Sequence, residues 1–140
     1  MNQINQVDLI ENRLKEIRMP KLKKHLLEVY NENKHKFKNC PASTKFHHRW
    51  AGGLYDHTLE VIEFALKIYD IMDRNSYGFN RDDVIFVSFA HDLDKLDKYV
   101  KNFDKESKQE FIWNKNRFST NDTAKVVKIL SKFGLEVNEE

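Results

Sequence analysis

The chain has 140 residues, enough for one domain, and its 24 lysines and arginines nearly balance 22 acidic residues, for a net charge of +2. This composition, one third charged and 40% hydrophobic, excludes a disordered, collagen-like or low-complexity chain. No apolar run reaches the roughly 18 residues of a membrane span. The single cysteine, Cys40, and an N-terminus without a secretory pattern predict a cytoplasmic location. With only 4 glycines and 2 prolines, we expect an all-α domain rather than a β-sandwich.

Two amphipathic helices are predicted first, followed by a polar loop. Asp8 is a candidate N-cap for the first helix, which Pro20 ends or kinks. Apolar periodicity predicts the second helix over residues 21–31. The polar and basic stretch over residues 32–44 is interpreted as a loop that leads into the rest of the domain.

This N-terminal region carries a local excess of positive charge. Nine basic residues stand there against four glutamates, Glu11, Glu16, Glu28 and Glu32; the basic residues are Arg13, Lys15, Arg18, Lys21, Lys23, Lys24, Lys34, Lys36 and Lys38. Such a surface could follow an RNA or DNA backbone, or it could simply be a solvated helical face.

The middle of the chain contains the strongest helical signal. Residues 55–72 are apolar almost all round the helix, which predicts a central, buried element. After a loop over residues 74–81, an apolar run over 84–90 fits either a buried strand or a buried helix. Asp82 and Asp83 before this run favour the helix, because carboxylates there accept hydrogen bonds from the first amides.

The C-terminal part mixes two kinds of signal. Aromatic and β-branched residues around an Asn-rich turn predict a short β-hairpin near residues 109–120. A last helix is predicted from residue 120 or 121, with Gly134 as its stop. Residues 138–140 resemble a helix start with no helix after it, which leaves two alternatives, a truncated chain or a natural frayed tail.

Histidines and carboxylates form the candidate chemistry. His91 and Asp92 directly follow the buried run, and at a helix end both can reach one divalent ion. The alternative is an ordinary helix end, in which His91 binds free carbonyls and Asp92 faces water. His57 lies on the apolar central helix and must find a partner there, either a core hydrogen bond or a metal ion.

Two other sets of histidines are less distinctive. His47, His48 and Arg49 are either part of a basic loop or the phosphate-facing edge of a site. His25 and His35 are expected to be ordinary surface residues.

Five motifs together resemble the HD superfamily of metal-dependent phosphohydrolases. The likeness is strongest to the branch that includes HD domains of bacterial 3′–5′ exoribonucleases, HD modules of conjugation proteins and small phage proteins. It covers about residues 41–99 and implies a helical HD-like domain over 1–140, with N-terminal helices over 1–40 and the HD core over 41–140. The motifs are Pro41-Ala42-Ser43, His47-His48, Gly52-Gly53-Leu54, His57-Thr58-Leu59-Glu60-Val61 and Ala90-His91-Asp92-Leu93-Asp94-Lys95-Leu96.

The resemblance implies a role for each matching residue. His57, His91 and Asp92 would bind the metal, and Lys95 would face the substrate phosphate. A fourth ligand would come from a later aspartate, and Asp122 is our candidate; Asp97 and Asp104 are the other candidates within the chain, and the ligand could also lie beyond it or be absent. Asp94 replaces a residue that is usually small in the family, and we expect it to face solvent.

The implied activity is hydrolysis of a phosphoester in a nucleotide or a short nucleic acid. A single divalent ion (Mn, Mg, Fe, Ni or Co) would activate water, and Asp92 would also orient that water. Lys95, Arg49 and either His47 or His48 would neutralise the phosphate. The alternative function is a catalytically inactive HD module that binds a nucleotide or nucleic acid. Neither alternative involves a membrane.

Overall fold

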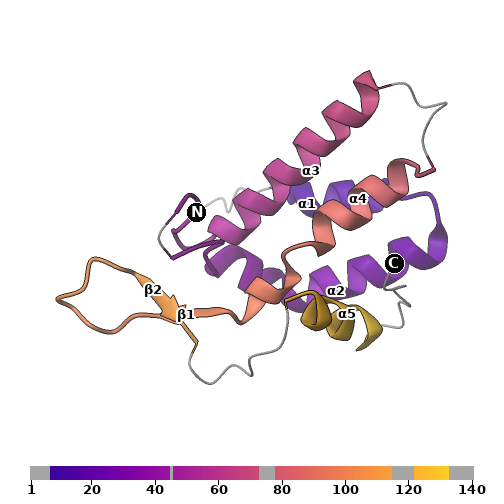
Figure 1. Cartoon of the computed structure of the whole chain (residues 1–140). Helices are drawn as coiled ribbons and strands as arrows, with labels where there is room; N and C mark the ends of the chain where they lie inside the picture. The colour runs from indigo at the N-terminus through magenta and orange to yellow at the C-terminus, as the bar shows by residue number, and fades with distance from the viewer. Residues whose placement is uncertain (1–6, 45, 73–77, 115–121, 133–140) are drawn as a thin grey trace, which may run out of the picture.

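Helices dominate the structure, as the composition predicts. The computed structural model describes residues 7–44, 46–72, 78–114 and 122–132, apart from the side chains of 122–125 and 132 (Figure 1). Its small antiparallel sheet accompanies the helices, so the predicted all-α class with one short hairpin is confirmed. None of the described helices is long and apolar enough to cross a membrane. The elements are α1 (Leu9–Lys15), α2 (Pro20–Asn39), α3 (Gly53–Ile71), α4 (Arg81–Ala90), the 3₁₀ helix η2 (Leu93–Leu96), β1 (Tyr99–Lys101), β2 (Phe111–Trp113) and α5 (Asp122–Lys132).

The first helix begins at its predicted N-cap but ends earlier than predicted. Pro20 was expected to end or kink this helix, whereas α1 already ends at Lys15 and Pro20 begins α2, which is longer than predicted. Asp8 caps α1 and accepts a hydrogen bond from the Glu11 amide at 3.1 Å. Pro20 occupies the first turn of α2, where its missing N–H removes no helical hydrogen bond. The loop predicted from residue 32 is wrong for residues 32–39, which continue α2. The reason is Phe37, which is only 1% exposed and holds the last turns of the helix against the core.

The central helix α3 packs beside α4, but it is buried along one face only (Figure 1). Its buried residues recur about every four positions and are Gly53, Leu54, Thr58, Ile62 and Leu66. Phe64, Ile68 and Ile71 are 63%, 54% and 84% exposed. The expected burial all round this helix was therefore wrong, because too few elements surround it in the described part of the chain.

The helix predicted for the apolar run is confirmed as α4, although the aspartates act differently from each other. Asn80 is the N-cap and forms a capping box with Asp83. Asp82 instead accepts hydrogen bonds from the Arg18 and Met19 amides at 2.9 and 3.0 Å. This carboxylate joins the start of α4 to the corner between α1 and α2.

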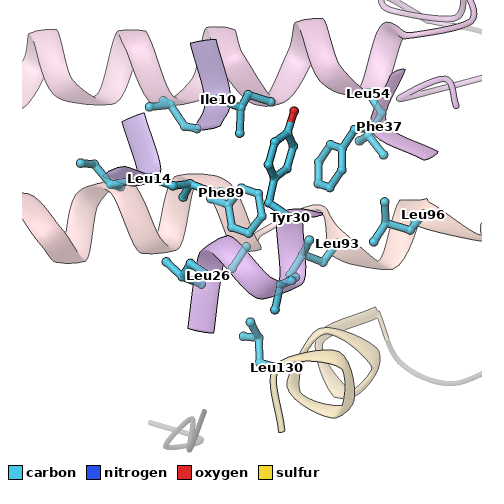
Figure 2. Packing of buried hydrophobic residues seen from close by; sticks show 14 of the residues in the cluster. Ile10, Leu14, Leu26, Tyr30, Phe37, Leu54, Phe89, Leu93, Leu96 and Leu130 are labelled. Atoms are coloured by element: carbon cyan, nitrogen blue, oxygen red, sulfur yellow. The ribbon is translucent and has the colours of Figure 1, made fainter. Parts of the chain in front are cut away.

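Three aromatic rings form the centre of the core (Figure 2). Tyr30 and Phe37 from α2 lie 5.5 Å apart between centroids, and Phe89 of α4 stacks on Phe37 at 5.7 Å. Each is at most 1% exposed. Leu130 points from α5 toward the same cluster, so the last helix shares this core. Such packing fixes the ends of α3 and α4, where the candidate site lies.

The small sheet projects from the helical body (Figure 1). β1 pairs with β2 in antiparallel register, with Tyr99 opposite Trp113 and their rings 5.6 Å apart. β2 lies in the predicted hairpin region, but its partner is Tyr99–Lys101, which the sequence analysis did not identify as a strand. The aromatic cross-strand pair accounts for this choice. The other predicted strand, near residues 117–120, lies outside the described residues.

Candidate metal centre

Three predicted ligands meet where α3 begins and α4 ends. His57 lies in the first turns of α3, His91 caps the C-terminus of α4, and Asp92 follows before η2. Asp92 Oδ2 lies 3.0 Å from His57 Nε2 and 3.1 Å from His91 Nε2. One ligand atom from each of the three residues lies within 4.8 Å of the others. The packing of two helices thus brings together residues that are far apart in the sequence.

The hydrogen bonding of His91 suits this residue to bind a cation. Its Nδ1 lies 2.6 Å from the Ser88 carbonyl oxygen, which can only accept, so Nδ1 carries the hydrogen. In the neutral ring, Nε2 then presents a lone pair to the Asp92 carboxylate. Two acceptors this close need a cation between them, either a proton or a metal ion. A backbone acceptor on the opposite ring nitrogen is typical of metal-binding histidines.

Charges around Asp92 keep its carboxylate ionised. Burial raises the pKa of the Asp92 carboxyl, but the hydrogen bond and charge of His91, together with Lys95, outweigh burial and hold this pKa well below its usual range. Lys95 Nζ lies 3.2 Å from Asp92 Oδ2. Burial lowers the pKa of His57, which favours the neutral imidazole that a metal requires. The donor set is therefore two imidazoles and one carboxylate, which fits a divalent transition metal.

The loop of residues 40–52, here called the histidine loop, is closed by backbone contacts. The Ala42 amide donates to the His48 carbonyl at 2.9 Å, and the Leu54 amide donates to the Cys40 carbonyl at 3.0 Å. His48 has a φ of 57°, which is unusual for a residue other than glycine. A Cβ at Gly53 would lie only 2.0 Å from the His48 carbonyl oxygen. Glycine at position 53 therefore permits the close approach that places His48 over α3.

A cavity of about 400 Å³ opens beside these residues and contains several of the predicted substrate contacts. It lies between the histidine loop and the segment from η2 to β1. A cavity of this size accommodates a small ligand. Its walls combine two aromatic rings, two lysines and two histidines and are formed by Ala42, Ser43, Phe46, His47, His57, Lys95, Lys98 and Tyr99.

Some of the sequence predictions fall elsewhere. Arg49 is exposed and does not line this cavity, so its phosphate contact stays a prediction. Asp122 begins α5, which packs against η2, but its side chain lies outside the described residues and its role as a ligand also stays a prediction. The expectation that Asp94 faces solvent was wrong: it is 2% exposed, and its carboxylate lies 3.6 Å from Lys98 Nζ. The tight turn of η2 directs this side chain inward. His35 is exposed as expected, whereas His25 is half-buried against expectation.

Sequence reasoning missed two supporting groups, Glu60 and Ser88. Glu60 Oε2 lies 2.8 Å from His48 Nε2. Glu60 is three residues after His57 on the same helix, so helical spacing could have placed it near the site. The role of Ser88 depends on its backbone carbonyl, and no side-chain pattern reveals that.

Comparison with known proteins gives a family and a partial relative. The family model described as "TraI_2: Putative helicase" matches residues 1–81, more than half of the chain, and the chain belongs to this family. A dihydroneopterin 2′,3′-cyclic phosphate phosphodiesterase from Methanocaldococcus jannaschii is 40% identical over 67 residues. The matched segment is 46% of this chain and 26% of the relative, so the chain spans about a quarter of that protein. No solved structure matches the chain.

Proposed function

We propose that this chain is an HD-type metal-dependent phosphoesterase, with one HD-like domain over residues 1–140. The observation that carries the proposal is the arrangement of His57, His91 and Asp92, in which the Ser88 carbonyl holds the hydrogen on Nδ1 of His91 and leaves its Nε2 facing the Asp92 carboxylate. Residues of these types at such distances are suited to hold a divalent ion. Asp122 is proposed as a further ligand.

The protein residues would divide the work around that ion. A bound divalent ion supplies positive charge that polarises a phosphoryl oxygen and acidifies water. His57 and His91 bind as neutral imidazoles, and Ser88 holds the His91 ring in the required orientation. Asp92 contributes a carboxylate that also accepts a hydrogen bond, and so orients the attacking water.

Lys95 is the proposed phosphate-binding residue. Its ammonium lies 3.2 Å from Asp92 and also lines the cavity, so it connects the candidate metal centre to the space where a substrate would bind. A fixed positive charge there stabilises the charge that develops on a phosphoryl oxygen. His47, in the opposite wall, is proposed to assist.

The cavity supports a substrate that joins a flat ring system to a phosphate. Phe46 and Tyr99 offer rings for stacking, while Lys95 and Lys98 offer positive charge. The partial relative is named for a pterin 2′,3′-cyclic phosphate. We therefore propose a nucleotide or nucleotide-like phosphodiester, with a 2′,3′-cyclic phosphate as the first candidate.

The description of the family as a helicase does not change this proposal. The sequence contains four glycines, and none begins the GxxxxGK(S/T) loop that cradles nucleoside triphosphate phosphates in many molecular motors. The proposed function therefore depends on the histidine and carboxylate site.

Hydrolysis assays with purified protein test the proposal. The chain is freed of metal, reloaded with Mn, Mg, Fe, Ni or Co, and offered 2′,3′-cyclic nucleotides, bis(p-nitrophenyl) phosphate and short oligonucleotides. We expect turnover with at least one metal, and a loss of about 10²-fold or more in Asp92→Asn and His57→Ala. Glu28→Gln and His35→Ala change exposed residues of α2 and serve as matched controls. Metal-dependent turnover that survives Asp92→Asn would contradict the assignment, and absence of turnover with every metal would favour the inactive binding module.

A further inference from the structure

A buried nitrogen of His48 has no hydrogen-bond partner among the residues that the structure describes. The His48 side chain is 10% exposed, and its Nδ1 lies in the interior without a hydrogen bond. Its other nitrogen, Nε2, lies 2.8 Å from Glu60 Oε2. An ionised carboxylate can only accept, so Nε2 carries the hydrogen and Nδ1 presents a lone pair. A buried acceptor without a partner is destabilising and needs an explanation.

Two other imidazoles lie next to the His48 ring. The rings of His47 and His57 are centred 5.1 and 5.2 Å from that of His48, and 5.8 Å from each other. One nitrogen from each of the three histidines lies within 4.8 Å of the others. This cluster contains His57 but neither His91 nor Asp92, so it is a second group of donors that shares only His57 with the first.

The backbone around His48 is arranged to hold this geometry. The positive φ of His48 is a conformation that costs free energy in a residue with a side chain. The Ala42 amide donates a hydrogen bond to the His48 carbonyl oxygen. Gly53 lies so close to the same oxygen that its Cα has no room for a side chain. The surrounding contacts therefore stabilise a strained residue, and its position brings its ring within 5.2 Å of the His57 ring between centroids.

The geometry points to a second divalent-cation position formed by His47, His48 and His57, beside the proposed HD-type centre. Glu60 is its positioning residue, because it holds the hydrogen on Nε2 of His48 and directs the Nδ1 lone pair toward the ion. Three imidazole nitrogens favour Zn, Co, Ni or Cu over Mg, which prefers oxygen ligands. The first ion of this pair rests on the proposed function, whereas the second rests on His47 and His48 of the histidine loop together with His57 of α3.

His57 belongs to both groups of donors. An imidazole nitrogen has one lone pair, so two ions at once require opposite nitrogens of the ring. Nε2 faces Asp92 and would serve the first ion, and Nδ1 would serve the second. His57 would then bridge the two ions as an imidazolate, with its proton released to solvent.

Metal stoichiometry tests the second position without any assay of activity. Metal-free protein is dialysed against Co²⁺, bound metal is counted by elemental analysis, and the visible spectrum reports nitrogen coordination. We expect two ions for the wild type and for His35→Ala. We expect one ion in His47→Ala, which changes an exposed residue, and one in Asp92→Asn. The variant with both changes should bind none, and Mg²⁺ should not displace the ion of the second position.

Variants of Glu60 test the second position more specifically than variants of the ligands do. Glu60 is more than half exposed, so its replacement should not disturb folding. Glu60→Ala should weaken the second ion about 10- to 100-fold and leave the first unchanged. Glu60→Gln keeps an acceptor oxygen and should restore most of the affinity. A wild-type chain that never holds more than one ion overturns the second position. If that chain still hydrolyses phosphodiesters, the proposed function stands, and if it binds no ion at all, both proposals fail.

Discussion

The aromatic core and the candidate metal centre share helix α4 but are stabilised in different ways. In the core, Tyr30, Phe37 and Phe89 pack against one another, and many neighbours contribute to the same burial. In the candidate metal centre, two imidazoles and one ammonium surround a single carboxylate, and a strained loop lies close by. The core gains stability from many interchangeable contacts, whereas the candidate metal centre depends on a few individual atoms. The same chain should therefore respond very differently to substitution in these two regions.

Phe89→Ala should have the largest effect, because it removes a ring from the centre of the core. We expect a loss of about 3–5 kcal/mol in the free energy of unfolding, measured by urea denaturation. Phe64→Ala is the matched control, since this ring on α3 is 63% exposed. Its change should stay within about 0.5 kcal/mol. Equal losses in the two variants would show that the core is not where the structure places it.

Gly53→Ala adds only one methyl group but should displace the histidine loop. The new Cβ would meet the His48 carbonyl oxygen, so the loop must shift, at a cost of about 1–3 kcal/mol. Affinity for Co²⁺ should fall as well, because His48 and the start of α3 move. Gly78→Ala is the control, with no atom within 4 Å of its new Cβ. Unfolding and metal titration are measured on both, and unaltered binding in Gly53→Ala would argue against a role for this contact.

Asp8→Asn tests the charge of a carboxylate that is hydrogen-bonded to Tyr30 of the aromatic core. Burial raises the pKa of Asp8, but the Tyr30 hydroxyl, the Glu11 amide and Lys38 outweigh it, so the folded-state pKa lies below 3.8. The carboxylate therefore stabilises the fold above about pH 4, and this contribution is lost as the pH falls through the folded-state pKa. We expect Asp8→Asn to cost about 1–2 kcal/mol at pH 7.

Denaturation across the pH range checks the sign of that effect. The difference between the wild type and Asp8→Asn should be constant from pH 7 to 5 and should shrink below pH 4, because the protonated wild-type carboxyl no longer pairs with Lys38. A difference that grows in acid would contradict the lowered pKa.

Thr58→Val should have the smallest effect. This buried residue lies next to the candidate ligand His57, so the substitution tests a position where the core meets the candidate metal centre. Thr58 follows His57 on α3 and is fully buried, and its hydroxyl has no hydrogen-bond partner in the described part of the chain. Replacing an unpaired hydroxyl by a methyl should leave the free energy of unfolding unchanged or raise it by about 0.5 kcal/mol. Thr58→Ser keeps the hydroxyl and loses the methyl, so it should be the less stable of the two. The opposite order of melting temperatures would show that the hydroxyl has a partner.

The difference between the two regions also explains what the sequence could predict. Helices reveal themselves by repeated apolar positions and by caps such as Asp8, and the all-α class followed from them. Phe37 was missed because one buried ring among charged residues has no periodic signal. For the candidate site, the motifs identified His57, His91 and Asp92, which the structure brings together. The carbonyl of Ser88 and the inward turn of Asp94 depend on backbone geometry, which residue types alone do not specify.

The histidine loop is closed at its ends through the main chain, although side chains such as His48 and Ser43 also hold it. Backbone hydrogen bonds join Ala42 to His48 and Cys40 to Leu54, while Ser43 and Phe46 between them supply part of the cavity wall. Almost any amino acid can take part in a backbone hydrogen bond, so the exposed wall position Phe46 can change during evolution without moving the histidines of the loop. Related chains could thus diverge in the compounds they accept while they retain one inherited chemistry.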